Sequence, residues 1–115
     1  MYIGEAGYPF TNLPQVVPRI LKVDPSGNVS VFVDTKLNSP IVNIVFHNRL
    51  LYVSHSDKIS TVISTVDTTN GTVKDIIVGL PNNGDHPNNQ IAFTPDGKRL
   101  FWNRNFDQYW SSRNG

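Results

Sequence analysis

The sequence contains no cysteine and few of the residues that build helices, with 2 Ala, 1 Glu and 1 Met among 115 residues. The absence of cysteine excludes disulfides and thiolate metal sites. No apolar run approaches the roughly 18 residues of a transmembrane helix, and the first residues lack the pattern of a signal peptide. The formal net charge is only +1, which argues against nucleic acid as a partner, because such a partner requires a basic face.

β-Branched residues and turn formers are abundant instead. The chain has 13 Val and 9 Ile, and Asn, Gly and Pro together account for 29 residues. Branched side chains pack well on a pleated sheet and lose rotamer freedom in a helix. Frequent turn residues divide such a chain into many short strands. The composition therefore predicts an all-β fold.

The expected strands recur with a regular spacing. Phe46 and Phe93 close similar apolar segments 47 residues apart, and Asp24 and Asp67 open similar hairpin turns 43 residues apart. Four short strands every 40–50 or so residues are typical of β-propeller blades. The pattern predicts a fragment of a β-propeller with about two to two and a half blades, in which residues 41–78 form one complete blade.

A propeller needs roughly 4–8 blades to close its ring. We therefore expect residues 1–98 to be a partial propeller belonging to a larger protein. The end blades would expose apolar faces and unpaired strand edges. Those edges could also pair between copies, which would give a discrete oligomer of a short protein.

The segment between two expected blades is the most specific part of the sequence. Residues 79–98 contain Asp85-His86, followed by a strand and the turn Pro95-Asp96-Gly97. This arrangement resembles the glucose/sorbosone dehydrogenase family. The resemblance covers about residues 1–98 and implies a six-bladed propeller, extracellular or periplasmic, that oxidises a sugar substrate with pyrroloquinoline quinone (PQQ) and calcium.

His86 matches the catalytic base of that family. A neutral imidazole suits removal of a hydroxyl proton while hydride leaves the anomeric carbon. The resemblance further implies that Asp85 orients the imidazole and that Asn88 and Asn89 contact the sugar. Ordinary turn formation is the alternative for all four residues.

The family binds its quinone and calcium through residues of later blades, and none of those residues has a match here. A base without its electron acceptor performs no redox chemistry. We therefore expect the chain to bind neither PQQ nor calcium and to be inactive alone. The alternative is a non-enzymatic propeller that serves as a binding scaffold.

The remaining candidates are expected to be structural. His47 lies in a turn and His55 at a strand end, and their spacing fits no local metal motif. Glu5 is expected to lie in a loop. Four aromatic residues are expected in blade cores, namely Phe46, Tyr52, Phe93 and Phe101.

The C-terminal residues 99–115 depart from the family pattern. They contain both tryptophans of the chain. Because Trp has a single codon, reading one base later turns Trp102 and Trp110 into glycine, and the shifted frame can resemble the family's Gly- and Thr-rich continuation. We expect a frameshift near Lys98 and an irregular tail after it.

Overall fold

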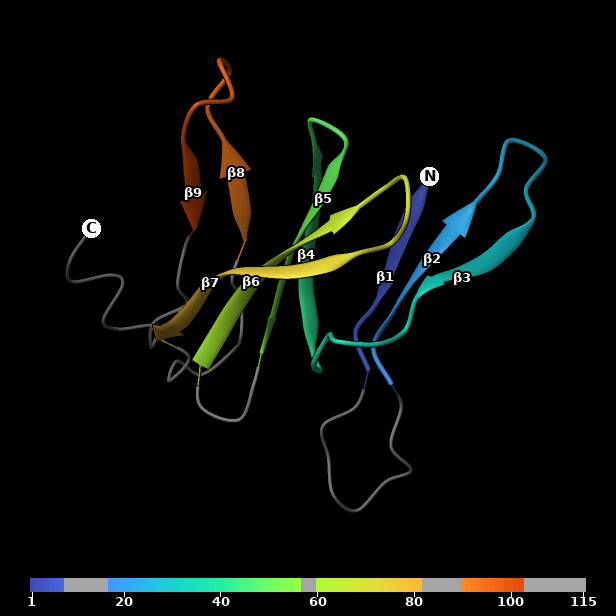
Figure 1. The fold of residues 1–115 in the computed structure, drawn as a ribbon, viewed down its shortest axis with the longest axis horizontal. Helices are drawn as coiled ribbons and strands as arrows, with labels where there is room; N and C mark the ends of the chain where they lie inside the picture. The colour runs from blue at the N-terminus through green and yellow to red at the C-terminus, as the bar shows by residue number, and fades with distance from the viewer. Residues whose placement is uncertain (8–16, 57–59, 82–89, 103–115) are drawn as a thin grey trace, which may run out of the picture.

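The computed structural model describes residues 1–7, 17–56, 60–81 and 90–102, and all of their regular structure is β (Figure 1). The prediction of an all-β fold is confirmed. The strands form three antiparallel sheets with the orders β1-β2-β3, β4-β5-β6-β7 and β8-β9, which we call sheets A, C and D. Their bounds are β1 Tyr2–Glu5, β2 Arg19–Val23, β3 Val29–Val33, β4 Ile41–His47, β5 Leu50–Ser56, β6 Ser60–Asp67, β7 Val73–Pro81, β8 Ile91–Phe93 and β9 Leu100–Trp102.

Sheet C extends from Ile41 to Pro81 and occupies the region in which a complete blade is expected. All three pairings are between strands consecutive in the chain. The β4–β5 turn consists of Asn48 and Arg49, whose φ angles of 52° and 68° match the type I′ turn that suits the twist of a hairpin. Strand β6 is buried on both faces up to Val66, because other parts of the chain cover sheet C from each side.

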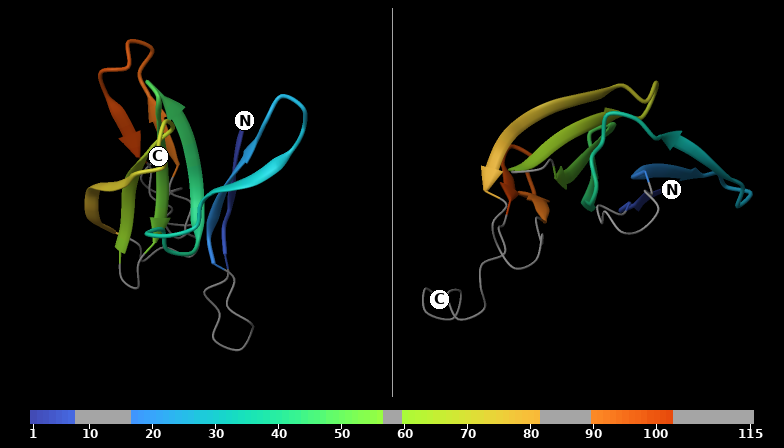
Figure 2. Two further views of the ribbon diagram at one scale, coloured as in Figure 1. Left: turned by 45° about the vertical axis from the view of Figure 1, so that its right-hand side comes forward. Right: turned by 90° about the horizontal axis from the view of Figure 1, so that it is seen from below.

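Sheets A and C pack against each other through an apolar core (Figure 2). Strands β1 and β4 are in contact at this junction, and the N–H of Ile41 donates a hydrogen bond to the carbonyl of Ala6 over 3.1 Å. An added Cβ at Gly4 would lie 3.3 Å from Ile41 Cγ2, so the two strands are close together there. The buried members of the core are Ile20, Val33, Leu37, Ile41, Leu51, Val53 and Val66.

Sheet D packs against the opposite face of sheet C. The backbone N–H of Ile91 donates a hydrogen bond to Asn43 Oδ1 over 3.0 Å, joining β8 to β4. The Phe93 ring stacks on His47, with ring centroids 4.1 Å apart and an interplanar angle of 16°. Tyr52 meets the same ring edge-on at 4.8 Å. Regular structure continues past Lys98, because β9 pairs with β8 across the turn at 95–98. The expected irregular tail therefore does not begin at residue 99.

Apolar side chains are exposed on both flanks of the three-sheet assembly, as expected for sheets with neighbours on one side only. On sheet A, Ile3 pairs with Leu21, and Leu21 pairs with Val31; this row lies on the face away from sheet C. Val31 is 48% exposed. On sheet D, Phe101 is 57% exposed. Both outer faces therefore offer apolar area that no described residue covers.

Three hairpin turns are organised by an aspartate. The Asp24 carboxylate accepts hydrogen bonds from the backbone N–H groups of Ser26 and Asn28, each over 2.9 Å. Asp67 accepts from Thr69, and Asp96 accepts from Thr94. Hydrogen bonds from Asn28, Thr69 and Thr94, respectively, lower the pKa values of Asp24, Asp67 and Asp96 below 3.8. The anionic carboxylates thus stabilise the turns.

Acid is expected to destabilise the fold through these three aspartates. Because their pKa values are lower in the folded protein, the unfolded chain binds more protons as the pH falls. Their contribution is complete above pH 3.8 or so and is lost as the pH falls through the lowered values. Thermal unfolding between pH 7 and pH 2.5 should show this loss. The triple variant Asp24→Asn, Asp67→Asn, Asp96→Asn should be less stable at pH 7 and less sensitive to acid; an unchanged pH slope would contradict the assignment.

Candidate functional site

The two ends of the sheets carry different kinds of connection. Tight turns close one end: residues 24–28, 48–49, 68–72 and 95–98. The other end, which we call the loop end, is where the described strands stop next to the longer connections of the chain: Glu5 pairs with Arg19 at the end of sheet A, and Ser60 pairs with Pro81 at the end of sheet C. Binding residues tend to lie on longer loops held by a rigid scaffold, so the loop end is the candidate functional site (Figure 1).

The four predicted site residues fall in one connection along the chain. Asp85, His86, Asn88 and Asn89 belong to the segment 82–89, which is outside the described residues. Its flanking strands are described: β7 ends at Pro81, and β8 begins at Ile91. The segment therefore runs from the edge strand of sheet C to the first strand of sheet D. The roles predicted for the four residues stay predictions.

A buried polar chain reaches the loop end inside sheet C. The N–H of Asn38 donates to His55 Nδ1 over 3.1 Å, so this nitrogen is an acceptor. The proton is therefore on Nε2, which donates to Ser64 Oγ over 2.7 Å, and Ser64 donates to Asp75 Oδ1 over 2.6 Å. Such hydrogen bonds satisfy polar groups that would otherwise be costly to bury.

The direction of these bonds excludes an activated serine. A nucleophilic serine gives its proton to histidine, whereas Ser64 gives its proton to Asp75 and accepts one from His55. His55 is 1% exposed. His55 lies next to the last residue of β5, in agreement with the strand end predicted for it, and the structural role predicted for it stays a prediction. The sequence spacing of His55, Ser64 and Asp75 does not predict these hydrogen bonds, because the three side chains come from three different strands.

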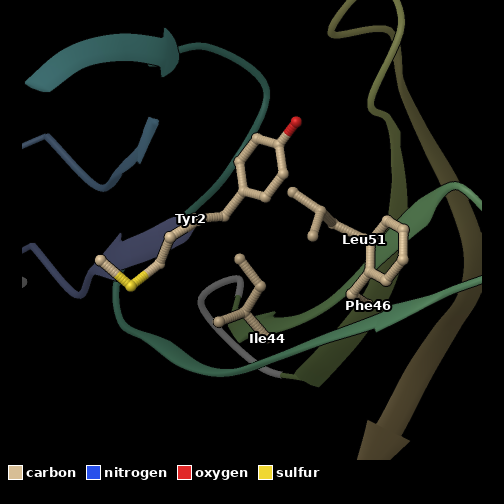
Figure 3. Close-up of a pocket in the computed structure, with 5 residues that line it drawn as sticks. Tyr2, Ile44, Phe46 and Leu51 are labelled. Carbon is tan, nitrogen blue, oxygen red and sulfur yellow. The ribbon is translucent and has the colours of Figure 1, made fainter. Parts of the chain in front are cut away.

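The aromatic predictions divide into two pairs. Tyr52 and Phe93 meet at the junction of sheets C and D. His47 stacks on Phe93 there as the last residue of β4, so it does not lie in a turn as predicted. Phe46 is 61% exposed and Phe101 is 57% exposed, so the prediction that these two lie in a core is wrong. Phe101 lies on a face that no described sheet covers, whereas Phe46 lies on the face of sheet C that packs against sheet A and lines the cleft between the two sheets (Figure 3).

Glu5 is the last residue of β1 and does not lie in a loop as predicted. Its carboxylate pairs with the Arg19 guanidinium over 2.6 Å, across the two strands that flank the segment 8–16. Both side chains are more than a third exposed, and such pairs contribute about 0–1 kcal/mol. The pair links the ends of β1 and β2 and adds little stability.

Among the described residues, no group of three or more His, Cys, Asp or Glu side chains could hold a metal ion. No helix in the described part of the chain is long and apolar enough to cross a membrane.

Comparison of the chain with protein-family models, with curated proteins and with solved structures found no match.

Proposed function

We propose that this chain contributes consecutive blades to a β-propeller that oxidises sugars, of the glucose/sorbosone dehydrogenase kind, with His86 as the base. The observation that carries this proposal is that β7 ends at Pro81 in one sheet and β8 begins at Ile91 in the next, so that residues 82–89 connect two neighbouring sheets along the chain. Its Asp85-His86 pair and the following Pro95-Asp96-Gly97 turn carry the resemblance. An extracellular or periplasmic location belongs to the same proposal.

The propeller part of the proposal is supported by a repeated relation between sheets. Sheets A, C and D follow one another along the chain, and each packs on the next. A tyrosine faces a phenylalanine at both junctions: Tyr52 faces Phe93 between C and D, and Tyr2 lies across a cleft from Phe46 between A and C. Repetition of one sheet-to-sheet relation is what generates a ring of blades.

The chain's own residues would act on the sugar as follows. His86, as a neutral imidazole, takes the proton of the hydroxyl at the anomeric carbon. Asp85 orients the imidazole by accepting its other ring N–H. Asn88 and Asn89 donate amide hydrogen bonds to sugar hydroxyls. PQQ and calcium would be held by residues of later blades, and the quinone would supply the electron acceptor of the reaction.

The test is a dye-reduction assay with aldoses, added PQQ and calcium. The 115-residue chain should be inactive, whereas a longer protein with the reading frame near Lys98 restored should be active. In that protein, His86→Gln should lower kcat/KM by about 10²–10⁴-fold, the usual contribution of a general base. Asn82→Ala, in the same segment, is the matched control and should retain activity.

Two results would overturn this proposal. If neither protein is active, the redox assignment is wrong. Sugar binding without electron transfer, unchanged by His86→Gln, would instead establish the non-enzymatic binding scaffold, because such a module has no use for a base at this position.

A further inference from the structure

Two asparagines in the hairpin turns begin the pattern Asn-x-Ser/Thr, which marks acceptors of N-linked glycans in secreted proteins. They are Asn28, in the sequence Asn-Val-Ser, and Asn70, in the sequence Asn-Gly-Thr. Both residues are exposed. The pattern is common by chance, so the hydrogen bonds of the two side-chain amides decide which of them suits a glycan.

The side chain of Asn70 uses only its carbonyl oxygen within the turn between β6 and β7 (Figure 1). Asn70 Oδ1 accepts a hydrogen bond from the backbone N–H of Thr72 over 2.9 Å, which forms an Asx turn. In the described part of the chain, no group accepts a hydrogen bond from Asn70 Nδ2. A glycan bonded to Nδ2 leaves the carbonyl oxygen unchanged. The turn would therefore keep all of its hydrogen bonds after modification.

The side chain of Asn28 is engaged through the nitrogen itself. Asn28 Nδ2 donates a hydrogen bond to Asp24 Oδ2 over 3.3 Å, and the backbone N–H of Asn28 donates to the other oxygen of that carboxylate over 2.9 Å. A sugar on Asn28 Nδ2 would lie against the carboxylate that organises this turn. Ser30, which completes the pattern, belongs to β3 and pairs with Lys22. The folded hairpin therefore disfavours Asn28 as an acceptor.

The surface of sheet C beside Asn70 has room for a sugar. Asn70 and Thr72 line a hollow of about 420 Å³, and Tyr52 and Ile76 belong to the same lining. A sugar ring has apolar C–H faces and polar hydroxyl groups. The aromatic and aliphatic side chains can pack against the former, and the threonine hydroxyl can bond to the latter. The hollow thus matches the chemistry of the first sugar of a glycan.

We propose that Asn70 is an N-glycosylation site and that Asn28 is not modified. The transfer forms a bond between Asn70 Nδ2 and C1 of the sugar, and it breaks the bond between that carbon and the pyrophosphate of a lipid-linked oligosaccharide. The lipid pyrophosphate leaves, and one amide proton passes to a base of the transferase. This inference rests on the extracellular location in the proposed function and is independent of sugar oxidation.

The test uses the 115-residue chain behind an added cleavable secretory leader, translated with microsomes that supply the transferase and the lipid-linked oligosaccharide. The chain should gain a single N-glycan, seen as a mobility shift that an N-glycan amidase reverses. Because this amidase converts the acceptor Asn to Asp, peptide mass spectrometry should find the conversion at residue 70 and not at residue 28. Thr72→Val should abolish the shift, whereas the matched control Ser30→Ala should leave it unchanged.

Asn70→Asp provides a second variant that preserves the turn. It keeps an oxygen acceptor for the N–H of Thr72 and removes the amide nitrogen, so it should also abolish the shift. No glycan, modification of Asn28 alone, or equal modification of the two asparagines would overturn the inference. The added leader supplies export and the assay contains no quinone, so its failure is separate from failure of the proposed function.

Discussion

Replacing Leu51 with alanine is expected to lower the free energy of unfolding by about 2–5 kcal/mol, the range for buried leucines. Leu51 is 2% exposed and belongs to the core between sheets A and C. Removing its methyl groups leaves a cavity that the strands on either side cannot close without breaking their pairing. Urea unfolding followed by circular dichroism measures the loss.

Phe46→Ala is the matched control for this prediction. Phe46 is the strand partner of Leu51, so both changes fall at one rung of the same hairpin. Because Phe46 is 61% exposed, its loss should alter stability by only about 0.5 kcal/mol, as for other surface positions. Equal losses in the two variants would mean that the core does not lie between these sheets.

The hairpins were predictable because their determinants are local. Asp24 and Asp67 each accept hydrogen bonds from the next residues of their own turn, so a short stretch of sequence contains the whole device. The chain then returns antiparallel, and the alternation of apolar residues locates the strands. Sheet C accordingly occupies the region predicted for a complete blade and extends slightly beyond it, to Pro81.

Contacts between strands and sheets were less predictable. The chain from His55 through Ser64 to Asp75 crosses three strands, and the β6–β7 register shifts on either side of Ile63. Such shifts move side chains between faces, so alternation alone cannot bring these three together. Strand β6 contains several hydroxyl residues and is nevertheless buried. Its sequence does not predict this burial, because burial on both faces depends on how the sheets pack.

The exposed phenylalanines illustrate the same limit. Alternation identifies an apolar position but does not say whether a neighbouring sheet covers it. Phe93 and Phe46 occupy corresponding places, yet only Phe93 receives a stacked His47 ring. The candidate catalytic residue is a further case, since the prediction for His86 depends on a motif and the fold locates only the strands that flank it.

Gly97→Ala is expected to lower the free energy of unfolding by about 2–4 kcal/mol, through two separate effects. The φ angle of Gly97 is +72°, and a Cβ in the left-handed region costs about 1–2 kcal/mol. An added Cβ would also lie 2.7 Å from Cε1 of His47. The His47 ring cannot retreat without losing its stack on Phe93, and overpacking of this kind costs about 1–3 kcal/mol.

Gly27→Ala separates the two effects. Gly27 has a φ angle of +87°, but nothing lies within 4 Å of an added Cβ, so this variant should show only the backbone cost. The difference between the two variants measures the contact with His47, and His47→Ala in the Gly97→Ala background should recover part of it. If the two variants lose the same free energy of unfolding, the His47 ring does not contact the β8–β9 turn at Gly97. The packing of sheet D on sheet C through His47 and Phe93 would then have to be revised.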